Sequence, residues 1–567
     1  MTSEQAAGGS PYAGKPWLKH YPPQVSGNLE YPYVPVTRLL EQAANEFPDS
    51  PATEFFGSRL TYQVLLTKAR KFAGALAGLG VEKGDRVALM LPNCPQAVIA
   101  FYGALLIGAV VVQVNPLYVE RELEFQLRDS GARTLVVLDL LYPRVDAISG
   151  RTGLHDVIVA RLHDYMPLPL RLLFPLKQRW DKKNAAVGPK AGVYFFQTLL
   201  RDAKTLPPRI EVKATDLALL QYTGGTTGVA KGAMLTHNNL VSNVCQIKDW
   251  MLDVRAGKEK MLCALPFFHV YGMTVAMNLA VAIAAEMIIL PKFEIERVLK
   301  AINKHKPTFF PGAPTMYVAL NTYPGIGKYD LSSIRSCISG SAPLPVEVQE
   351  TFERITGGKL VEGYGLTEAS PVTHCNPMVG LRKNGTIGIP LADTECKIVD
   401  PVSGEESPVG EAGELVVKGP QVMLGYWGRP GETTACLRDG WLFTGDIASM
   451  DEDGFFQVVD RKKDVIIAGG FNIYPREIEE VLYQHPKIKE AAVIGVPDPY
   501  RGETVKAFLV LKPNERCSAE DIVQFCRTRL ATFKIPRQVE FRQELPKSII
   551  GKVLKRQLLE QERESKK

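Results

Sequence analysis

The sequence predicts a multidomain α/β protein. We expect a large N-terminal domain of helix-flanked, mostly parallel sheets with a small barrel-like subdomain, followed by a small mobile α/β domain. The chain has 567 residues, more than the roughly 250–300 at which a single hydrophobic core stops growing. Short β-branched segments alternate with helical patterns over residues 60–350, which is typical of a parallel sheet covered by helices. After residue 385, short strands separated by turn dipeptides replace this alternation.

In the first region we expect strands at 86–91, 108–114, 133–139, 286–291 and 335–340, and helices at 95–108 and 120–131. The apolar stretch 97–111 raises the alternative of a membrane span, for which about 15–18 apolar residues are marginal. Gly103 and Gly108 interrupt it, and Gln113 ends it. A buried helix that turns at Gly108 into a buried parallel strand explains the stretch without lipid.

The second region, 385–460, has expected strands at 395–400, 413–419 and 454–460, separated by turns such as Asp453-Gly454. This pattern predicts an antiparallel, barrel-like subdomain. Five consecutive charged residues, 460–464, follow it and are costly to bury. We therefore expect a surface connector there, with one domain over 1–462 and a second over 463–567. The second domain should contain strands at 465–468, 488–498 and 503–511 and helices at 474–486 and 518–530.

Composition excludes several classes of protein. The hydrophobic fraction of 46% and charged fraction of 23% are ordinary for a globular protein, and a net charge of +6 over this length gives no case for nucleic acid. Nine cysteines without a CxxC pair favour reduced thiols in a cytoplasmic protein. The N-terminal residues have neither a basic start nor an apolar run, so we expect no signal peptide.

A polar, glycine-rich stretch, YTGGTTGVAKG, spans residues 222–232. Its glycines let the backbone turn N–H groups toward a ligand, and its threonines add hydroxyl donors, an arrangement that commonly binds phosphates. It does not match the Walker loop, because Ala230 stands where that motif has glycine and Gly232 follows Lys231 in place of serine or threonine. We therefore expect a phosphate loop of another class of nucleotide enzyme.

Four further stretches are too polar or too rich in glycine for simple packing. Residues 339–345 (SGSAPLP) offer a small-residue surface for a flat ring. Residues 362–368 (EGYGLTE) combine an aromatic ring, a hydroxyl and a carboxylate. Asp446, at the end of an expected strand, suits a pair of ribose hydroxyls, and Lys552 follows Gly551 on an expected mobile loop. Each stretch is a weak signal alone, whereas their order as a set is specific.

The set resembles the adenylate-forming superfamily of acyl-CoA synthetases, luciferases and adenylation domains. The resemblance runs from about residue 60 to Lys552 and is closest to the long-chain fatty-acid–CoA ligases of bacteria. It is carried by QYTGGTTGVAKGAMLTHNNL, VEGYGLTEASPVTHCNP, DRKKDVIIAGGFNIYPREIEEVL and GVPDPYRGETVKAF. It implies activation of a long-chain fatty acid by ATP to an acyl adenylate, with release of pyrophosphate, and then transfer to coenzyme A. ATP, Mg²⁺ and coenzyme A are the implied cofactors and co-substrates.

The resemblance also implies roles for particular residues. Lys552 would bridge the carboxylate and the α-phosphate, His269 would lie between nucleotide and acyl group, and Glu368 would ligate Mg²⁺ beside Thr223. The implied catalytic set is Lys552, His269, Thr367 and Glu368. The residues implied to bind cofactors are Thr223, Gly224, Gly225, Thr226, Thr227, Gly228 and Lys231 at the phosphates, Thr367 and Lys552 at the α-phosphate, Gly340, Ser341, Ala342, Glu362, Gly363, Tyr364 and Gly365 around the adenine, Asp446 and Arg461 at the ribose, and Gly469 and Gly470 at the pantetheine arm.

Two positions depart from the family's pattern. Ala230 replaces the proline that often precedes the loop lysine, which implies a less rigid loop. Ile550 stands where a threonine or serine usually precedes the glycine, so a hydroxyl is missing. Because Gly551 and Lys552 remain, we expect adenylation to survive.

In the family the small domain rotates between the two half-reactions, here about a hinge near Lys463. One static site cannot present both Lys552 and a thiol to the same carbonyl. The acyl group should lie against segments 270–273 and 312–316, which are small or apolar. Each buried methylene contributes about 0.8 kcal/mol, so a tunnel can select for length. The sequence does not reveal its depth, and medium-chain, branched and aryl acids remain alternatives.

Two other functions stay open. The first is an acyl-AMP ligase that hands the acyl group to a carrier protein instead of coenzyme A. The second is a nucleotide-sensing or scaffold protein that keeps the pocket without the chemistry. The joint presence of Lys552, Glu368, Asp446 and Arg461 argues against the second, because binding alone does not need a catalytic lysine.

The segment 164–180, DYMPLPLRLLFPLKQRW, interleaves apolar residues with three prolines and three basic residues. Such a segment can rest on an anionic membrane surface, where fatty acids partition. The alternative is a loop packed on the main domain. We thus expect a cytoplasmic protein, with peripheral contact at the inner face of the cell membrane as a hypothesis. The sequence leaves the oligomeric state open, a homodimer included.

Overall fold

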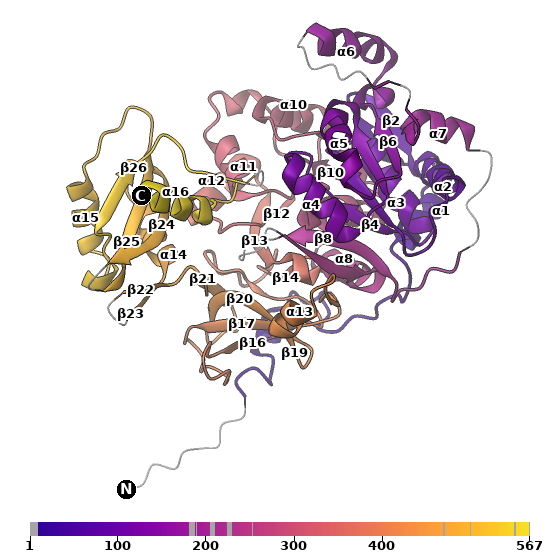
Figure 1. Ribbon diagram of the computed structural model, residues 1–567. Coiled ribbons are helices and arrows are strands. Elements are labelled where there is room, and N and C mark those ends of the chain that lie inside the picture. The colour runs from indigo at the N-terminus through magenta and orange to yellow at the C-terminus, as the bar shows by residue number, and fades with distance from the viewer. Residues whose placement is uncertain are drawn as a thin grey trace.

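The structure is a computed structural model that describes residues 10–180, 187–188, 190–203, 210–223, 230–251, 253–468, 471–498, 501–548 and 551–565. A small C-terminal domain (yellow) lies beside a much larger body built from three groups of strands (Figure 1). The predicted α/β class, with a large N-terminal and a small C-terminal domain, is confirmed.

The largest sheet has eight described strands in the order β18–β9–β8–β4–β3–β5–β6–β7. The strands from β8 to β7 pair in parallel, and β9 and β18 are antiparallel additions at one edge. The bounds are β3 (Arg86–Met90), β4 (Val110–Gln113), β5 (Thr134–Leu138), β6 (Asp156–Ala160), β7 (Val193–Phe195), β8 (Leu217–Thr223), β9 (Lys231–Thr236) and β18 (Gly425–Tyr426).

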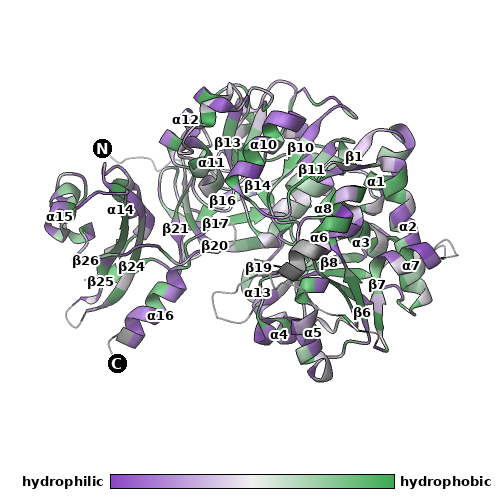
Figure 2. Cartoon of the chain, turned by 90° about the horizontal axis from the view of Figure 1, so that it is seen from above, coloured by the Kyte–Doolittle hydropathy of each residue, from purple (hydrophilic) through white to green (hydrophobic). Residues whose placement is uncertain are grey.

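Helices cover both faces of this sheet, because successive strand residues point to opposite sides. On β4, Val111 packs into the cluster that contains α2 and α3, whereas Val110 and Val112 pack with α4 and α5. The sheet strands are mostly hydrophobic (green) in Figure 2, and the outer helices carry hydrophilic (purple) residues. The helices are α1 (Thr37–Glu46), α2 (Tyr62–Gly78), α3 (Pro95–Leu106), α4 (Glu120–Ser130), α5 (Tyr142–Ile148), α7 (Phe196–Asp202) and α8 (His237–Trp250).

The apolar stretch 97–111 behaves as the sequence predicts. Helix α3 ends at Leu106, Gly108 takes a left-handed conformation with a φ of 70°, and β4 begins at Val110. Both elements are buried in the sheet–helix core. Among the described residues, no helix is long and apolar enough to cross a membrane.

A second group of strands forms two short sheets that Phe309 joins through bridges to Met261 and Ser336. Their orders are β10–β11–β1–β2 and β12–β13–β14–β15. The bounds are β1 (Pro51–Phe55), β2 (Ser58–Thr61), β10 (Lys260–Cys263), β11 (Glu286–Ile289), β12 (Ser336–Ser339), β13 (Lys359–Gly365), β14 (Val372–Cys375) and β15 (Ile389–Pro390); the helices are α9 (Leu279–Ala282), α10 (Ile295–His305), α11 (Pro314–Asn321) and α12 (Val346–Thr356). A π-helix spans Gly272–Asn278, and 3₁₀ helices lie at Pro16–His20, Asp139–Leu141, Ser149–Arg151, Leu162–Tyr165, Ile326–Lys328, Thr367–Ala369 and Thr532–Lys534.

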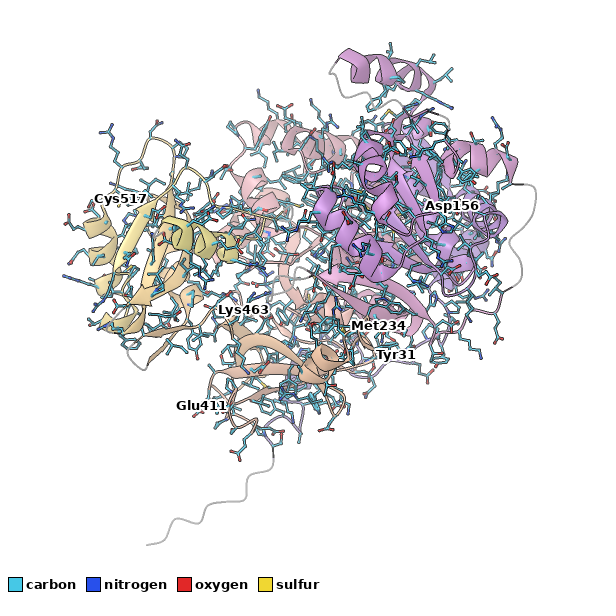
Figure 3. The ribbon with its side chains drawn as sticks, in the orientation of Figure 1. Tyr31, Asp156, Met234, Glu411, Lys463 and Cys517 are labelled. Atoms are coloured by element: carbon cyan, nitrogen blue, oxygen red, sulfur yellow. The ribbon has the colours of Figure 1, made fainter. Side chains whose placement is uncertain are left out.

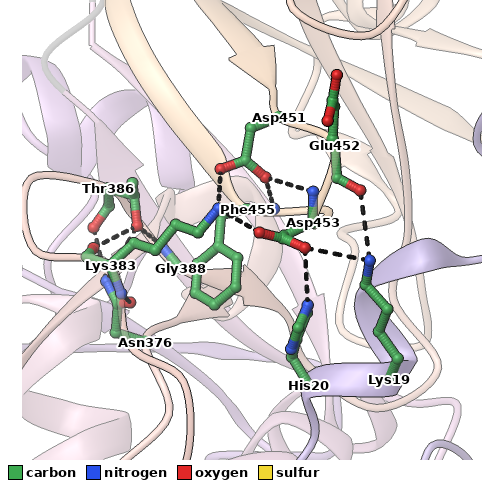
Figure 4. A network of polar contacts seen from close by, with 10 residues as sticks. All are labelled: Lys19, His20, Asn376, Lys383, Thr386, Gly388, Asp451, Glu452, Asp453 and Phe455. Carbon is green, nitrogen blue, oxygen red and sulfur yellow. Dashed lines mark hydrogen bonds and ion pairs between the residues drawn. The ribbon is translucent and has the colours of Figure 1, made fainter.

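The third group is the antiparallel subdomain that the turn-rich region predicts. Its strands run in the order β16–β17–β20–β19, and β21 pairs with β20. Its elements are β16 (Glu395–Val399), β17 (Gly413–Lys418), α13 (Pro430–Cys436), β19 (Leu437–Arg438), β20 (Trp441–Met450) and β21 (Phe456–Arg461). The Lys383 ammonium lies 2.6 Å from Asp451 and 2.8 Å from Asp453, and Lys19 reaches Asp453 at 3.2 Å (Figure 4). These contacts tie the N-terminal segment to the turn before β21.

The C-terminal domain has a sheet of its own, in the order β23–β22–β25–β24, with β26 parallel to β25. Its apolar residues, among them Ile478, Val493 and Leu509, form clusters separate from the core of the large body. Pro475 is the first residue of α14, where its missing N–H costs nothing. The elements are β22 (Ile466–Ala468), β23 (Phe471–Ile473), α14 (Pro475–Tyr483), β24 (Ile488–Asp498), β25 (Gly502–Leu511), α15 (Ala519–Arg527), β26 (Gln538–Phe541) and α16 (Lys555–Ser565).

The segment 164–180 is mostly a helix, α6 (Leu168–Trp180), and not the packed loop of the alternative interpretation. It stands off the top of the large body in Figure 1. Leu168 and Leu172 are 71% and 68% exposed, which is unusual for leucine on two successive turns. Phe174 anchors the helix by a tilted ring contact with His163.

Candidate active site

The expected phosphate loop joins the two strands of a hairpin. Strands β8 and β9 pair with Thr223 opposite Lys231 and Tyr222 opposite Gly232, so the loop leaves and re-enters the sheet at adjacent positions. The loop residues Gly224, Gly225, Thr226, Thr227 and Gly228 lie outside the described residues. A side chain at Gly232 would press on the Tyr222 ring, at 3.1 Å from a built Cβ atom.

Lys231 and Glu368 are linked through Tyr426. The Tyr426 hydroxyl donates to Glu368 Oε1 at 2.6 Å, and the Lys231 ammonium lies over the Tyr426 ring at 5.1 Å. Lys231 also pairs with Glu432 of α13. Glu368 lies in the 3₁₀ turn Thr367–Ala369 that follows β13, so Thr367 and Glu368 are placed beside the mouth of the hairpin.

The small-residue surface that the sequence predicts for the adenine lies where two parallel strands end together. Ser339 of β12 pairs with Glu362 of β13, so the following residues emerge at one edge. A Cβ atom at Gly340 would lie 3.2 Å from the Tyr271 ring and 3.5 Å from the Gly363 carbonyl, which explains the need for glycine. Ser341, with a φ of 74°, turns the chain toward Ala342.

The second glycine-rich stretch is held by close backbone packing. A Cβ atom at Gly365 would overlap the Pro371 carbonyl at 1.9 Å. Glu362 is buried, and its Oε2 accepts from the Leu344 N–H at 3.2 Å, so it supports the adenine loop from behind. Burial raises the pKa of Glu362 to about 7, against the opposing charge of Arg476 from the small domain.

Tyr364, Asp446 and Arg461 come together from three strands. The Tyr364 hydroxyl donates to Asp446 Oδ2 at 2.6 Å, and Arg461 Nε lies 3.4 Å from Asp446 Oδ1. The expectation that a strand ends at Asp446 is wrong, because β20 continues to Met450. Gly445, with a φ of 71°, and a register shift against β17 form an irregularity that aims Asp446 into the site without ending the strand.

Lys552 of the small domain lies within electrostatic range of this cluster. Burial lowers the pKa of Lys552 to about 8, and the nearby Arg461 and Lys463 cations lower it further while Asp446 opposes them. The lysine follows a tight loop in which Ser548 Oγ accepts from the Lys552 N–H at 3.2 Å. Gly551 packs so closely on α11 that a Cβ atom there would lie 2.3 Å from Thr315 Oγ1.

His269 directly precedes the expected acyl segment 270–273 and lies within electrostatic range of Lys552. Burial, followed by the charge of Lys552, lowers the pKa of His269 to about 4, so the ring is neutral at pH 7. Its Nδ1 accepts from the Tyr271 N–H at 3.2 Å. The Tyr271 hydroxyl in turn donates to the Ile338 carbonyl at 2.7 Å, which connects segment 270–273 to the adenine strand β12.

The structure thus gathers the described candidates around one edge of the large body, next to the small domain. Gly469 and Gly470 lie outside the described residues, as does Ile550. Sequence reasoning missed Tyr426, Glu432 and Arg476. No local sequence pattern marks these three residues, because each contacts or influences a site residue that is distant in the sequence: Glu368, Lys231 and Glu362, respectively.

Comparisons with known proteins identify the family. The family model described as AMP-binding enzyme matches residues 40–427, and the model of the AMP-binding enzyme C-terminal domain matches residues 477–552. A long-chain-fatty-acid–CoA ligase of Bacillus subtilis is 51% identical over 97% of this chain and 99% of its own length. The ligase of the same name from Salmonella typhimurium is 41% identical over 97% and 98%.

Solved structures resemble the whole chain as well. ATP-bound MatB from Rhodopseudomonas palustris superposes with a TM-score of 0.81 and 31% identity, covering 93% of this chain and 98% of its own. The anthranilate CoA ligase AuaEII in complex with anthranoyl-AMP gives a TM-score of 0.83 and 28% identity, covering 95% and 98%. The resemblance drawn from the sequence motifs is therefore confirmed, and the chain belongs to the AMP-binding enzyme family.

Proposed function

We propose that this chain is an AMP-forming ligase that joins a long-chain fatty acid to coenzyme A with consumption of ATP. The single observation that carries the proposal is that Lys552, from the small domain, is buried within electrostatic range of the Asp446–Arg461 ion pair of the large domain. The names of its full-length relatives support the substrate class.

In the first half-reaction a carboxylate oxygen of the acid attacks the α-phosphorus of ATP. The acyl–O–P bond forms, the bond to the β-phosphate oxygen breaks, and pyrophosphate leaves. Two anions approach each other, so oriented positive charge is what the site must supply. We assign that task to the Lys552 ammonium at the reacting centre, and to Lys231 at the loop that receives the β- and γ-phosphates. Asp446, shared by Tyr364 and Arg461, would hold the ribose hydroxyls.

Glu368 is the residue that would hold Mg²⁺, with Thr223 beside it. Mg²⁺ prefers oxygen ligands and is often bound through one or two carboxylates plus substrate phosphates. One Glu368 oxygen accepts from Tyr426 at 2.6 Å, which orients the carboxylate and leaves its second oxygen for a cation. The donor set therefore fits Mg²⁺, which when bound would neutralise phosphate charge.

In the second half-reaction the thiol of coenzyme A attacks the acyl carbonyl, the thioester forms, and AMP leaves. We propose that the small domain, residues 463–567, first turns about Lys463 to withdraw Lys552. Support comes from the short connection between β21, which ends at Arg461, and β22, which begins at Ile466, and from the separate core beyond it. Figure 3 labels Lys463 between the two parts. We assign the pantetheine passage to Gly469 and Gly470.

The test is a pyrophosphate-release screen over fatty acids of graded length, with free coenzyme A, acyl-carrier protein or no acceptor. We expect release with a long-chain class and thioester only with free coenzyme A. Thioester formed on the carrier protein alone would replace the proposal by an acyl-AMP ligase. Saturation by a medium-chain or aryl acid would change the substrate class, and no release with any acid would refute the proposal.

We further propose that α6 rests on an anionic membrane surface from which fatty acids are drawn. Four leucines of the helix, Leu168, Leu170, Leu172 and Leu173, are between 44% and 71% exposed. Their substitution by glutamine should abolish co-sedimentation with vesicles that contain anionic lipid. The control replaces the exposed Val402 of the antiparallel subdomain and the exposed Leu424, which directly precedes β18, and equal binding of both variants would refute the proposal. A homodimer stays a hypothesis, and light scattering, which gives the mass of the particle in solution, would test it.

A further inference from the structure

Asp129 joins the phosphate-loop hairpin to the segment that carries Tyr426 and Glu432. It lies in the last turn of α4, on the face of the large sheet that α4 and α5 cover. Its side chain is 14% exposed. A carboxylate at the C-terminal end of a helix is disfavoured by the helix dipole. Asp129 therefore does not stabilise its own helix, and any favourable free energy that it contributes comes from the groups that bind its carboxylate.

Three groups from two segments converge on Asp129. The Tyr222 hydroxyl donates to Oδ2 at 2.7 Å, and Arg429 Nη2 donates to Oδ1 at 2.7 Å. The Trp427 indole N–H donates to the backbone carbonyl of Asp129 at 3.2 Å. Both carboxylate oxygens thus accept one bond each, from two segments that are distant in the sequence.

The first partner controls where the phosphate loop begins. Tyr222 is 8% exposed and directly precedes Thr223, the last described residue before the loop. Its ring packs on Gly232, directly after Lys231, where the loop returns. Holding the Tyr222 hydroxyl therefore holds both ends of the loop.

The second partner controls the segment 425–433. The Arg429 N–H donates to the Tyr426 carbonyl at 3.1 Å, and Trp427 N–H donates to the Gly232 carbonyl at 2.8 Å. From this segment Tyr426 orients Glu368, and Glu432 pairs with Lys231. By holding Arg429, the Asp129 carboxylate thus acts indirectly on Lys231, expected at the phosphates, and on Glu368, expected at Mg²⁺.

We infer that Asp129 is a positioning residue that holds Tyr222 and the segment 425–433, and through them sets Thr223, Lys231 and Glu368 in register for binding the β- and γ-phosphates of ATP. The inference rests on the proposed function and deepens it. Asp129 itself touches no reacting atom. Its loss should therefore weaken the steps that involve pyrophosphate and spare the step after pyrophosphate has left.

The experiment compares Asp129→Asn and Tyr222→Phe in the full-length enzyme. In the first half-reaction we expect the KM for ATP to rise about tenfold, the size of effect of one charge-assisted hydrogen bond, with little change in the KM for the acid. Calorimetric titration with ATP alone should show the same loss of ATP affinity in the absence of turnover. In the second half-reaction, supplied acyl adenylate and coenzyme A should yield thioester within about twofold of the wild-type rate, and Asp129→Glu should restore part of the ATP affinity.

The matched control is Asp146→Asn on α5. Asp146 also accepts from a cation, Lys190 at 2.6 Å, and a tyrosine, Tyr142 at 3.3 Å, but none of these touches the hairpin. It should leave both half-reactions unchanged. An unaltered affinity for ATP in both test variants, or an equal fall in both half-reactions, would overturn the inference. If the wild-type enzyme releases no pyrophosphate with any acid, the proposed function is refuted instead. Calorimetric titration with ATP would still test the inference, because it compares the ATP affinities of wild type and variants without turnover.

Discussion

Replacement of Lys552 by alanine should slow acyl-adenylate formation by about 10²–10³-fold, the usual cost of removing one electrostatic group from a transition state. The structure adds a pH dependence that is specific to this residue. Burial and the neighbouring Arg461 and Lys463 lower the pKa of Lys552 to about 8, well below the usual range of lysine. The cationic form is the catalytic one, so activity should be present below this pKa and lost above it.

The magnitude follows from the titration. With a pKa of about 8, about nine-tenths of the lysine is charged at pH 7 and about one-tenth at pH 9. The value of kcat/KM for ATP, which reports the enzyme before ATP binds, should therefore fall about tenfold over this interval. Bound phosphates favour the cation, so the profile of kcat should move to higher pH.

The assay is pyrophosphate release at saturating fatty acid, with thioester formation from supplied acyl adenylate as the internal control. Lys552→Arg keeps the charge at all these pH values and should give a low but flat profile. Lys552→Ala should leave the second half-reaction near the wild-type rate. Full-speed pyrophosphate release by the alanine variant, or an unchanged pH profile in the arginine variant, would refute the assignment.

Three further outcomes are expected. Asp446→Asn should raise the KM for ATP by about 10–100-fold, because it weakens charge-assisted bonds to the ribose; an unchanged KM would remove Asp446 from the site. Glu362→Gln should raise the free energy of unfolding more at pH 8 than at pH 5, by up to about 3 kcal/mol. Burial raises the pKa of Glu362 to about 7, so the native glutamate penalises folding progressively as pH rises from its ordinary pKa of 4.5 to that value, and fully above it; equal gains at both pH values would contradict this. Gly470→Leu should leave pyrophosphate release intact and suppress thioester formation, and equal loss of both half-reactions would refute the assignment of the pantetheine passage.

Much of the fold was predictable because the strands and helices follow simple periodicities. The strand over 86–91 and the helix over 95–108 were located within one or two residues, since a short apolar run marks the strand and a proline at the first helical turn marks the helix. The strand through Asp446 was predicted too short, because a glycine irregularity that redirects a side chain looks in sequence like a strand end. Helix α6 was ambiguous, because prolines and exposed leucines fit no common soluble element.

The candidate site divides in the same way. Local motifs located Lys231, Tyr364, Asp446 and Lys552, because each lies in a short glycine-rich or polar run whose residue types suit nucleotide chemistry. They also indicated the family, the cofactors and the two-domain plan. The links between the motifs were invisible: Asp129 meets Arg429 across 300 positions of sequence, and Tyr426 meets Glu368 across 58.

The sequence by itself determined which chemical groups this protein has for activating an acid, because those groups are encoded in contiguous runs. Only the tertiary structure decided how they are held: which tyrosine orients the carboxylate, which aspartate aligns the loop, and how far burial shifts the pKa of the lysine. Such properties depend on distances and on exclusion of water, and these arise only when remote segments pack together.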